Sequence, residues 1–182
     1  MDYYELMIVG TGGRGVLLLG RLLAQAGMEK YEYSLFFPNY APAMRGGESE
    51  CTVILSDDYV NSPVMFNPDF ALAMTGSALN LIKDRVASGG SLILDSSVIS
   101  EKVSREDVTT FYIPATEKAV ALGGNQAANM VLLGAYLEHT GAVPLTYVEK
   151  ALDARLSGET KKDILLLNKA ALNEGAGLMA NY

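Results

Sequence analysis

The spacing of apolar and polar positions predicts strands that alternate with helices along most of the chain. Residues 4–9 are apolar except for Glu5, which predicts a short strand that ends at Gly10. Apolar positions then recur from 16 to 26 and predict a helix over 16–27, with Gly27 suited to stop it as a C-terminal cap. The chain therefore opens with a strand, a glycine-rich turn and a helix, the first half of a βαβ unit.

The same pattern predicts five further strands and five further helices. The strands are expected at 31–37, 48–55, 69–74, 91–94 and 109–113, and the helices at 77–87, 116–122, 125–138, 146–156 and 160–175. Helices dominate the second half of the chain. We expect one domain over residues 1–182, a three-layer Rossmann-like α/β fold with a mostly parallel sheet and a helical C-terminal part.

Composition narrows the class of protein. The 182 residues include 14 Lys and Arg against 21 Asp and Glu, a net charge of −7 that argues against nucleic-acid binding. The apolar runs fall short of the ~20 residues of a membrane span. No basic segment precedes an apolar stretch at the start, so a secretory signal peptide is not expected. We expect a cytoplasmic domain. Its apolar content of 49% suggests a surface that other subunits cover, so the isolated chain is expected to self-associate.

Redox and metal chemistry have few candidate residues in this sequence. Cys51 and His139 are the only residues of their kinds, which excludes an internal disulfide and the ligands of an iron–sulfur cluster on this chain alone. Cys51 falls in a buried strand, as an inert thiol does. His139 falls in the last turn of a helix, where a cation suits the helix dipole. The sequence predicts no catalytic set and no metal site of its own.

The turn GTGGRG at 10–15 is the first candidate binding site. Its glycines allow the backbone to approach a phosphate at the start of the following helix. Three interpretations stay open: a phosphate-bearing ligand, an NAD(P) or flavin site of a stand-alone Rossmann-like oxidoreductase, or a packing turn in a scaffold that binds nothing. The acidic residue that dinucleotide sites carry ~20 residues further on is missing or misplaced here.

Two other groups of polar residues are candidates. Arg45 stands beside Gly46 and Gly47 in a ten-residue loop over 38–47, where its guanidinium could meet a phosphate at the same edge of the sheet as the glycine turn. The alternative is a solvated surface arginine. Asn125 and Asn129 lie one helical turn apart on an apolar helix, which suggests hydrogen bonds to a loop or partner. Asn125 could instead cap the helix, and Asn129 could be an ordinary hydrogen-bonded side chain.

Six segments in order resemble the gamma subunit, or gamma domain, of the 2-oxoacid:ferredoxin oxidoreductases. They are GTGGRG with its apolar helix, YAPAMRGGESECTVILSD from 40, PDFALAM from 68, IPAT from 113, GGNQAANMVLLGA from 123 and NKAALNEG from 168. The resemblance covers nearly the whole chain. It implies that the chain is related to the pyruvate, 2-oxoglutarate and ketoisovalerate oxidoreductases of anaerobic metabolism. These enzymes decarboxylate a 2-oxoacid oxidatively to an acyl-coenzyme A and reduce ferredoxin.

The resemblance also implies a division of labour among subunits. Thiamine diphosphate, magnesium and the 4Fe-4S clusters belong to the partner alpha, beta and delta subunits, and coenzyme A lies at the interface. This chain would then be a non-redox subunit, inactive when isolated. The residues implied for the coenzyme A side are Gly10, Thr11, Gly12, Gly13, Gly15, Arg45, Gly46 and Gly47. A common family form has Gln at the position of Arg14, which leaves open whether Arg14 meets a ligand or a partner.

Overall fold

The computed structural model describes residues 2–39, 47–62, 66–158 and 161–182. The elements are β1 (Tyr3–Thr11), α1 (Val16–Gly27), β2 (Tyr33–Asn39), β3 (Glu48–Ser56), β4 (Phe70–Ala73), α2 (Gly76–Ile82), β5 (Ser91–Asp95), β6 (Thr109–Ile113), α3 (Ala115–Leu122), the 3-10 helix η1 (Asn125–Ala127), α4 (Ala128–Thr140), α5 (Leu145–Arg155) and α6 (Lys162–Ala180). Each predicted strand and helix has its counterpart, so the predicted element order is confirmed.

The strands form one mixed sheet in the order β2-β3-β1-β4-β5-β6. Neighbours from β1 through β4 and β5 to β6 are parallel, which confirms the mostly parallel sheet. β3 is antiparallel to both of its neighbours, β1 and β2. β1 and β2 therefore run in the same direction but do not pair, because β3 lies between them and interrupts the simple βαβ unit that the sequence predicted.

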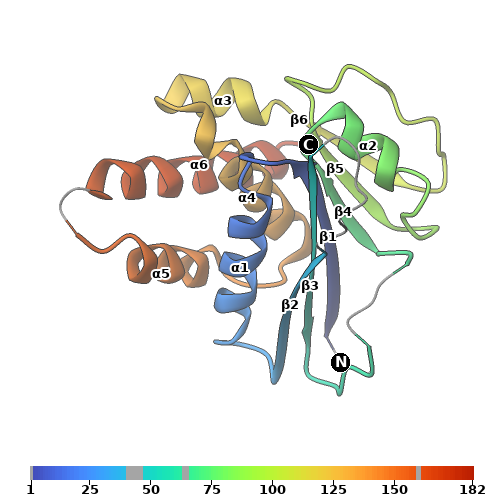
Figure 1. The fold of residues 1–182 in the computed structure, drawn as a ribbon, viewed down its shortest axis with the longest axis horizontal. Helices are drawn as coiled ribbons and strands as arrows, with labels where there is room; N and C mark the ends of the chain where they lie inside the picture. Colours follow the sequence, from blue (N-terminus) through green and yellow to red (C-terminus); the bar gives the residue numbers. More distant parts are fainter. Residues whose placement is uncertain (1, 40–46, 63–65, 159–160) are drawn as a thin grey trace.

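Alternating side chains of β1 divide the apolar core between the two faces of the sheet. Leu6 and Ile8 join the cluster formed with α1, α4, α5 and α6, whereas Met7 and Val9 join the cluster formed with α2. Figure 1 shows this arrangement, with α2 on one side of the sheet and α1, α4, α5 and α6 on the other. The expected three layers are present. Within the described ranges, no helix combines the length and apolar character needed to cross a membrane.

Two details of the helices differ from the sequence prediction. Gly27 is the last residue of α1 rather than a left-handed cap after it, and it has no positive φ. A Cβ there would lie 2.3 Å from Leu55 Cδ2, so the missing side chain makes room for β3. α2 ends at Ile82 instead of 87, because the N–H of Ala87 donates to the carbonyl of Pro68 and turns the chain back toward the sheet.

Helix α4 is buried along almost its whole length and lies very close to α6. Every residue from Ala128 to Leu137 is buried. A Cβ on Gly134 would lie 1.9 Å from the carbonyl oxygen of Leu172, and a Cβ on Gly175 would lie 1.9 Å from that of Val131. The two backbones therefore approach each other at a distance that only glycine allows.

Replacing Gly175 tests this contact. Gly175→Ala adds a methyl group where there is no space, and we expect the free energy of unfolding to fall by about 1–3 kcal/mol, measured by urea denaturation. Gly177→Ala is the matched control, because Gly177 lies on the same helix, is exposed, and has nothing within 4 Å of the added Cβ. That control should be neutral or slightly stabilising. Equal stability of the two variants would contradict the close contact.

Cys51 is fully buried in β3, and its Sγ lies 3.5 Å from the carbonyl oxygen of Val16. Burial raises the pKa of this thiol to about 12, so almost none of it is the reactive thiolate at neutral pH. The predicted inert core thiol is confirmed.

His139 lies in the last turn of α4, as predicted, but its environment does not favour a cation. Its Nε2 lies 3.0 Å from Ser91 Oγ, and its ring packs against Phe111 with centroids 4.5 Å apart. Burial lowers the pKa of His139. The burial of the ring therefore disfavours the cation that the sequence predicts at this helix end, because desolvation penalises the charged form.

The lowered pKa of His139 predicts a pH dependence of stability. The unfolded chain binds a proton on this ring near its ordinary pKa of about 6.5, and the folded chain binds it only at lower pH. Stability therefore declines as the pH falls below about 6.5. We expect the difference in unfolding free energy between wild type and His139→Phe to shrink by up to about 1 kcal/mol between about pH 7.5 and 5.5. A difference independent of pH would contradict the lowered pKa.

Candidate functional site

The glycine turn lies where the connections from two neighbouring strands leave the sheet on opposite faces. β1 leads to α1 on one face, and the adjacent parallel strand β4 leads to α2 on the other. In open α/β sheets, ligands bind in the crevice that such a change of direction creates at the carboxyl ends of the strands. The topology therefore places the candidate turn at the edge of the sheet that most favours a ligand.

The turn itself has a defined backbone geometry. Gly13 and Gly15 adopt φ values of 85° and 78°, in the left-handed region that favours glycine. The N–H of Arg14 donates to the carbonyl of Thr11 at 3.2 Å, which closes the turn. Gly10 and Thr11 belong to β1 and pair with β3, and a Cβ on Gly10 would lie 2.9 Å from Cβ of Met74.

The described end of the 38–47 loop contacts this turn. The N–H of Gly12 donates to the carbonyl of Gly47 at 2.9 Å. This contact places Gly47, the described end of the loop, at the same edge of the sheet as the glycine turn. Arg45 and Gly46 lie outside the described residues, so their predicted role stays a prediction.

The N-terminus of α1 is suited to an anion. Its N-cap is Gly15, which has no side chain to accept from the first-turn N–H groups, and the first turn has no acidic residue. In the part of the chain that the structure describes, no backbone carbonyl accepts from the N–H of Gly13 or Gly15. These N–H groups and the helix dipole favour a negatively charged ligand.

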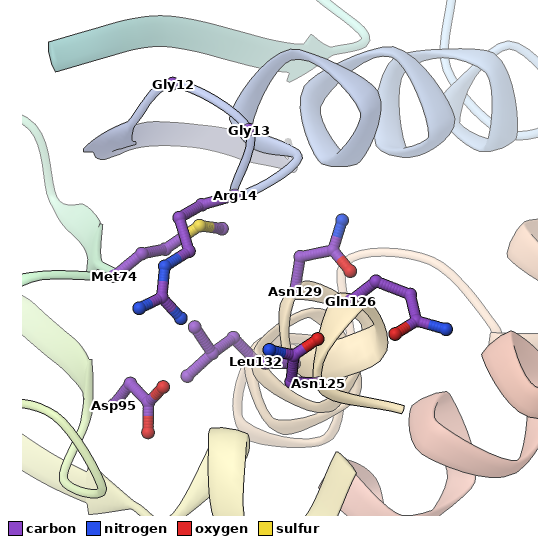
Figure 2. Close-up of a pocket in the computed structure, with 10 residues that line it drawn as sticks. Gly12, Gly13, Arg14, Met74, Asp95, Asn125, Gln126, Asn129 and Leu132 are labelled. Carbon is purple, nitrogen blue, oxygen red and sulfur yellow. The ribbon is translucent and has the colours of Figure 1, made fainter. Parts of the chain in front are cut away.

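A cavity of about 340 Å³ opens between the turn and α4. The residues around it come from the ends of β4 and β5, from the turn, and from the segment that begins α4: Gly12, Gly13, Arg14, Met74, Asp95, Asn125, Gln126, Ala128, Asn129 and Leu132. Figure 2 shows the Arg14 guanidinium pointing into this space, between Asp95 and the start of α4. The cavity combines a cation, a carboxylate and three amides.

Arg14 is connected to Asp95 through a hydroxyl group. Thr116 Oγ1 donates to Asp95 Oδ2 at 2.5 Å and accepts from Arg14 Nη1 at 3.5 Å. Asp95 is 1% exposed and also accepts from the N–H groups of Ser97 and Thr116. Arg14 forms no ion pair with any described residue. Its remaining N–H donors are therefore available to an anion in the cavity.

Asn129 connects α4 to the glycine turn. It is 3% exposed, and its Nδ2 donates to the carbonyl of Gly15 at 3.3 Å. Its Oδ1 is buried and has no donor among the described residues. The predicted hydrogen bond from this residue to a loop is therefore confirmed. Asn125 begins η1 with its side chain exposed, and η1 is capped by Gly124, so the capping role considered for Asn125 is wrong.

Two residues at this site were not predicted as site residues: Asp95, which lines the cavity, and Thr116, which is hydrogen-bonded to Asp95 and Arg14. Asp95 stood out only as the end of a strand, and Thr116 only as the last residue of the IPAT segment. The signal was their place at the carboxyl ends of neighbouring parallel strands, where ligand-binding residues gather. Among the described residues, no group of three or more His, Cys, Asp or Glu side chains could hold a metal ion.

Comparison with known proteins identifies the class of protein. The family profile described as pyruvate ferredoxin/flavodoxin oxidoreductase matches residues 5–178. The chain is 34% identical to the 2-oxoglutarate synthase subunit KorC of Methanothermobacter marburgensis over 170 residues, which cover 88% of this chain and 91% of that protein. The chain belongs to this oxidoreductase family.

Its place within the family follows from two further matches. The gamma subunit of a keto/oxoacid ferredoxin oxidoreductase from Geobacter sulfurreducens superimposes with a TM-score of 0.84 and 28% identity, covering 98% of this chain and 99% of that one. The ketoisovalerate oxidoreductase subunit VorA of Methanothermobacter thermautotrophicus is 35% identical over 93% of this chain but only 35% of its own length. The protein is a gamma subunit of a 2-oxoacid:ferredoxin oxidoreductase.

The fold also matches within a larger protein. The 2-oxoglutarate:ferredoxin oxidoreductase from Magnetococcus marinus, solved with 2-oxoglutarate, coenzyme A and succinyl-CoA bound, superimposes with a TM-score of 0.88 and 21% identity. The match covers all of this chain and 32% of that one. At this identity the comparison concerns the fold alone.

The hydroxyl of Thr116 offers a test of the hydrogen-bonded cluster. Thr116→Val leaves the buried carboxylate of Asp95 without its hydroxyl donor, and we expect a loss of about 1.5–3 kcal/mol in unfolding free energy, as for a hydrogen bond to a charged group. Thr116→Ser keeps the donor and should cost less than about 1 kcal/mol. Urea denaturation measures both. Equal losses would show that the methyl group, and not the hydroxyl, matters.

Proposed function

We propose that this subunit forms part of the coenzyme A site of its oxidoreductase. The observation that carries the proposal is the guanidinium of Arg14, which faces a cavity beside the glycine turn and forms no ion pair with a described residue. Coenzyme A carries phosphates, which a guanidinium and helix N–H groups both bind. Gly12, Gly13 and Gly15 shape the turn, and Gly10 and Thr11 anchor it in the sheet.

The same proposal assigns the chemistry to partner subunits. The complex would decarboxylate a 2-oxoacid oxidatively, transfer the acyl group to coenzyme A and pass the electrons to ferredoxin. Thiamine diphosphate, magnesium and the 4Fe-4S clusters would lie on the alpha, beta and delta subunits. This fits the donor set of the present chain, whose lone cysteine is buried with a raised pKa. The role of this chain is then to bind and orient coenzyme A and to hold its neighbours.

Exposed apolar side chains support the second part of that role. Val120 and Leu122 on α3 and Ile164 and Leu166 on α6 are between 39% and 56% exposed. α3 and α6 pack against each other, so these side chains lie on adjacent elements. We infer that they contribute to contacts with other subunits, as the high apolar content suggests.

Arg14→Gln tests the proposed coenzyme A site in the assembled complex. Loss of a charge-assisted hydrogen bond should raise the KM for coenzyme A roughly tenfold and change kcat little, because the contact is made in the ground state and transition state alike. The assay uses pyruvate, 2-oxoglutarate and 2-oxoisovalerate in turn. The control is Arg21→Gln, since Arg21 lies on α1 over the ring of Phe36 and away from the cavity.

An unchanged KM in Arg14→Gln would remove Arg14 from the site. Arg45→Ala, in the same assay, tests separately the arginine that the sequence singles out. A complex that binds NADH or FMN, but not coenzyme A, in calorimetry would contradict the proposal as a whole. It would favour the dinucleotide interpretation of the turn.

A further inference from the structure

The amide oxygen of Asn129 lacks a partner at the wall of the cavity. The nitrogen of the same amide is fixed on the carbonyl of Gly15, which defines the orientation of the group. No described residue supplies a donor to Oδ1, although this oxygen is buried. A buried acceptor without a donor is costly, and native structures rarely keep one without a role.

The surroundings of this oxygen indicate what could satisfy it. Figure 2 shows the amide nitrogen of Asn129 toward the start of α1 and the oxygen on the side of Gln126. The same cavity is also lined by Gly12, Gly13 and Arg14, which favour an anion. The cavity therefore has donors on the side of the turn and an unused acceptor on the side of α4. A ligand that fits both sides carries a negative group and an N–H or O–H group close to it.

The size of the cavity limits how much of a ligand it takes. About 340 Å³ is near the lower end of the ~300–1,000 Å³ range of small-molecule pockets. It suits one polar portion of coenzyme A rather than the whole molecule. Both halves of coenzyme A carry hydrogen-bond donors near the diphosphate: a hydroxyl and an amide N–H in the pantetheine arm, and the free 2′-hydroxyl of the ribose, whose 3′-oxygen is phosphorylated.

We propose that Asn129 Oδ1 accepts a hydrogen bond from an N–H or O–H group of coenzyme A that lies next to its diphosphate. This rests on the proposed coenzyme A function of the subunit. Asn129 then selects for the organic portion of the ligand, whereas the turn and Arg14 bind its charge. Asn129 also links these two parts of the site, because its amide nitrogen is bound to the carbonyl of Gly15 in the glycine turn and thereby orients its oxygen.

The test measures binding to the assembled complex by calorimetry, with wild type and Asn129→Leu. The four probes are coenzyme A, 4′-phosphopantetheine, adenosine 3′,5′-bisphosphate and inorganic pyrophosphate. We expect Asn129→Leu to weaken coenzyme A about three- to tenfold, the effect of one neutral hydrogen bond, and to leave pyrophosphate within about twofold. Of 4′-phosphopantetheine and adenosine 3′,5′-bisphosphate, the fragment that carries the donor should lose as much affinity as coenzyme A does. The affinity of the other fragment should not change.

A merely structural role of Asn129 predicts a different result. Loss of its bond to Gly15 would loosen the turn and weaken pyrophosphate as much as coenzyme A, and that outcome overturns the proposal. Unchanged binding of coenzyme A also overturns it, since the oxygen would then be satisfied within the protein. If wild type binds neither coenzyme A nor pyrophosphate, the proposed function fails first.

Two further variants complete the design. Asn129→Ala removes the same oxygen without adding bulk, and it replaces Asn129→Leu where that variant does not assemble. Asn168→Leu is the matched control, because Asn168 is also a buried asparagine but bonds to the carbonyl of Ile164 on its own helix. It should leave all four affinities unchanged. A loss of affinity in this control equal to that in Asn129→Leu would contradict a specific role for Asn129.

Discussion

The close approach of α4 and α6 is the constraint on which the rest of the structure depends. With a Cβ at Gly134 or Gly175, the carbonyls of the facing helix would be only 1.9 Å away. Because these glycines let α6 pack closely on α4, α4 is enclosed between the sheet and another helix. All of its residues from 128 to 137 are buried. A helix held on all sides has little freedom to shift. Its first turn is therefore a rigid wall for the cavity at the edge of the sheet.

The position of α4 also determines the electrostatics at its two ends. Its first turn places Asn129 within hydrogen-bond distance of the carbonyl of Gly15, the N-cap residue of α1. Its last turn places His139 beside Ser91, at the beginning of β5, whereas Asp95 of the cavity ends that strand. The titratable ring and the cavity are thus at opposite edges of the sheet. Protonation of His139 affects stability without a direct contact with the proposed ligand site.

Local patterns were enough to predict the order of elements, but not how distant segments meet. Alternating apolar positions identify a strand such as 48–55 without revealing its direction, so the antiparallel insertion of β3 beside β1 was not predictable from them. The sequence predicts Gly27 as the stop of a helix, whereas in the structure the side chain of Leu55, on β3, leaves no room for a side chain at this position. Arg14 and Thr116 are 102 positions apart, and only the folded chain brings them together. What the sequence did predict was the edge of the sheet at which they meet.

The distribution of polar groups favours a binding role over a chemical one. A catalytic subunit needs a nucleophile or base that has a pKa suited to the reaction and lies within reach of the ligand. Here the thiol of Cys51 is buried with its pKa raised to about 12, and the imidazole of His139 lies at the other edge of the sheet. The groups that do face the cavity are a guanidinium, amides and a carboxylate held by three hydrogen bonds. A guanidinium and amides bind and orient a ligand without changing their own protonation. This is the chemistry that the proposed coenzyme A role requires of the groups that line the cavity.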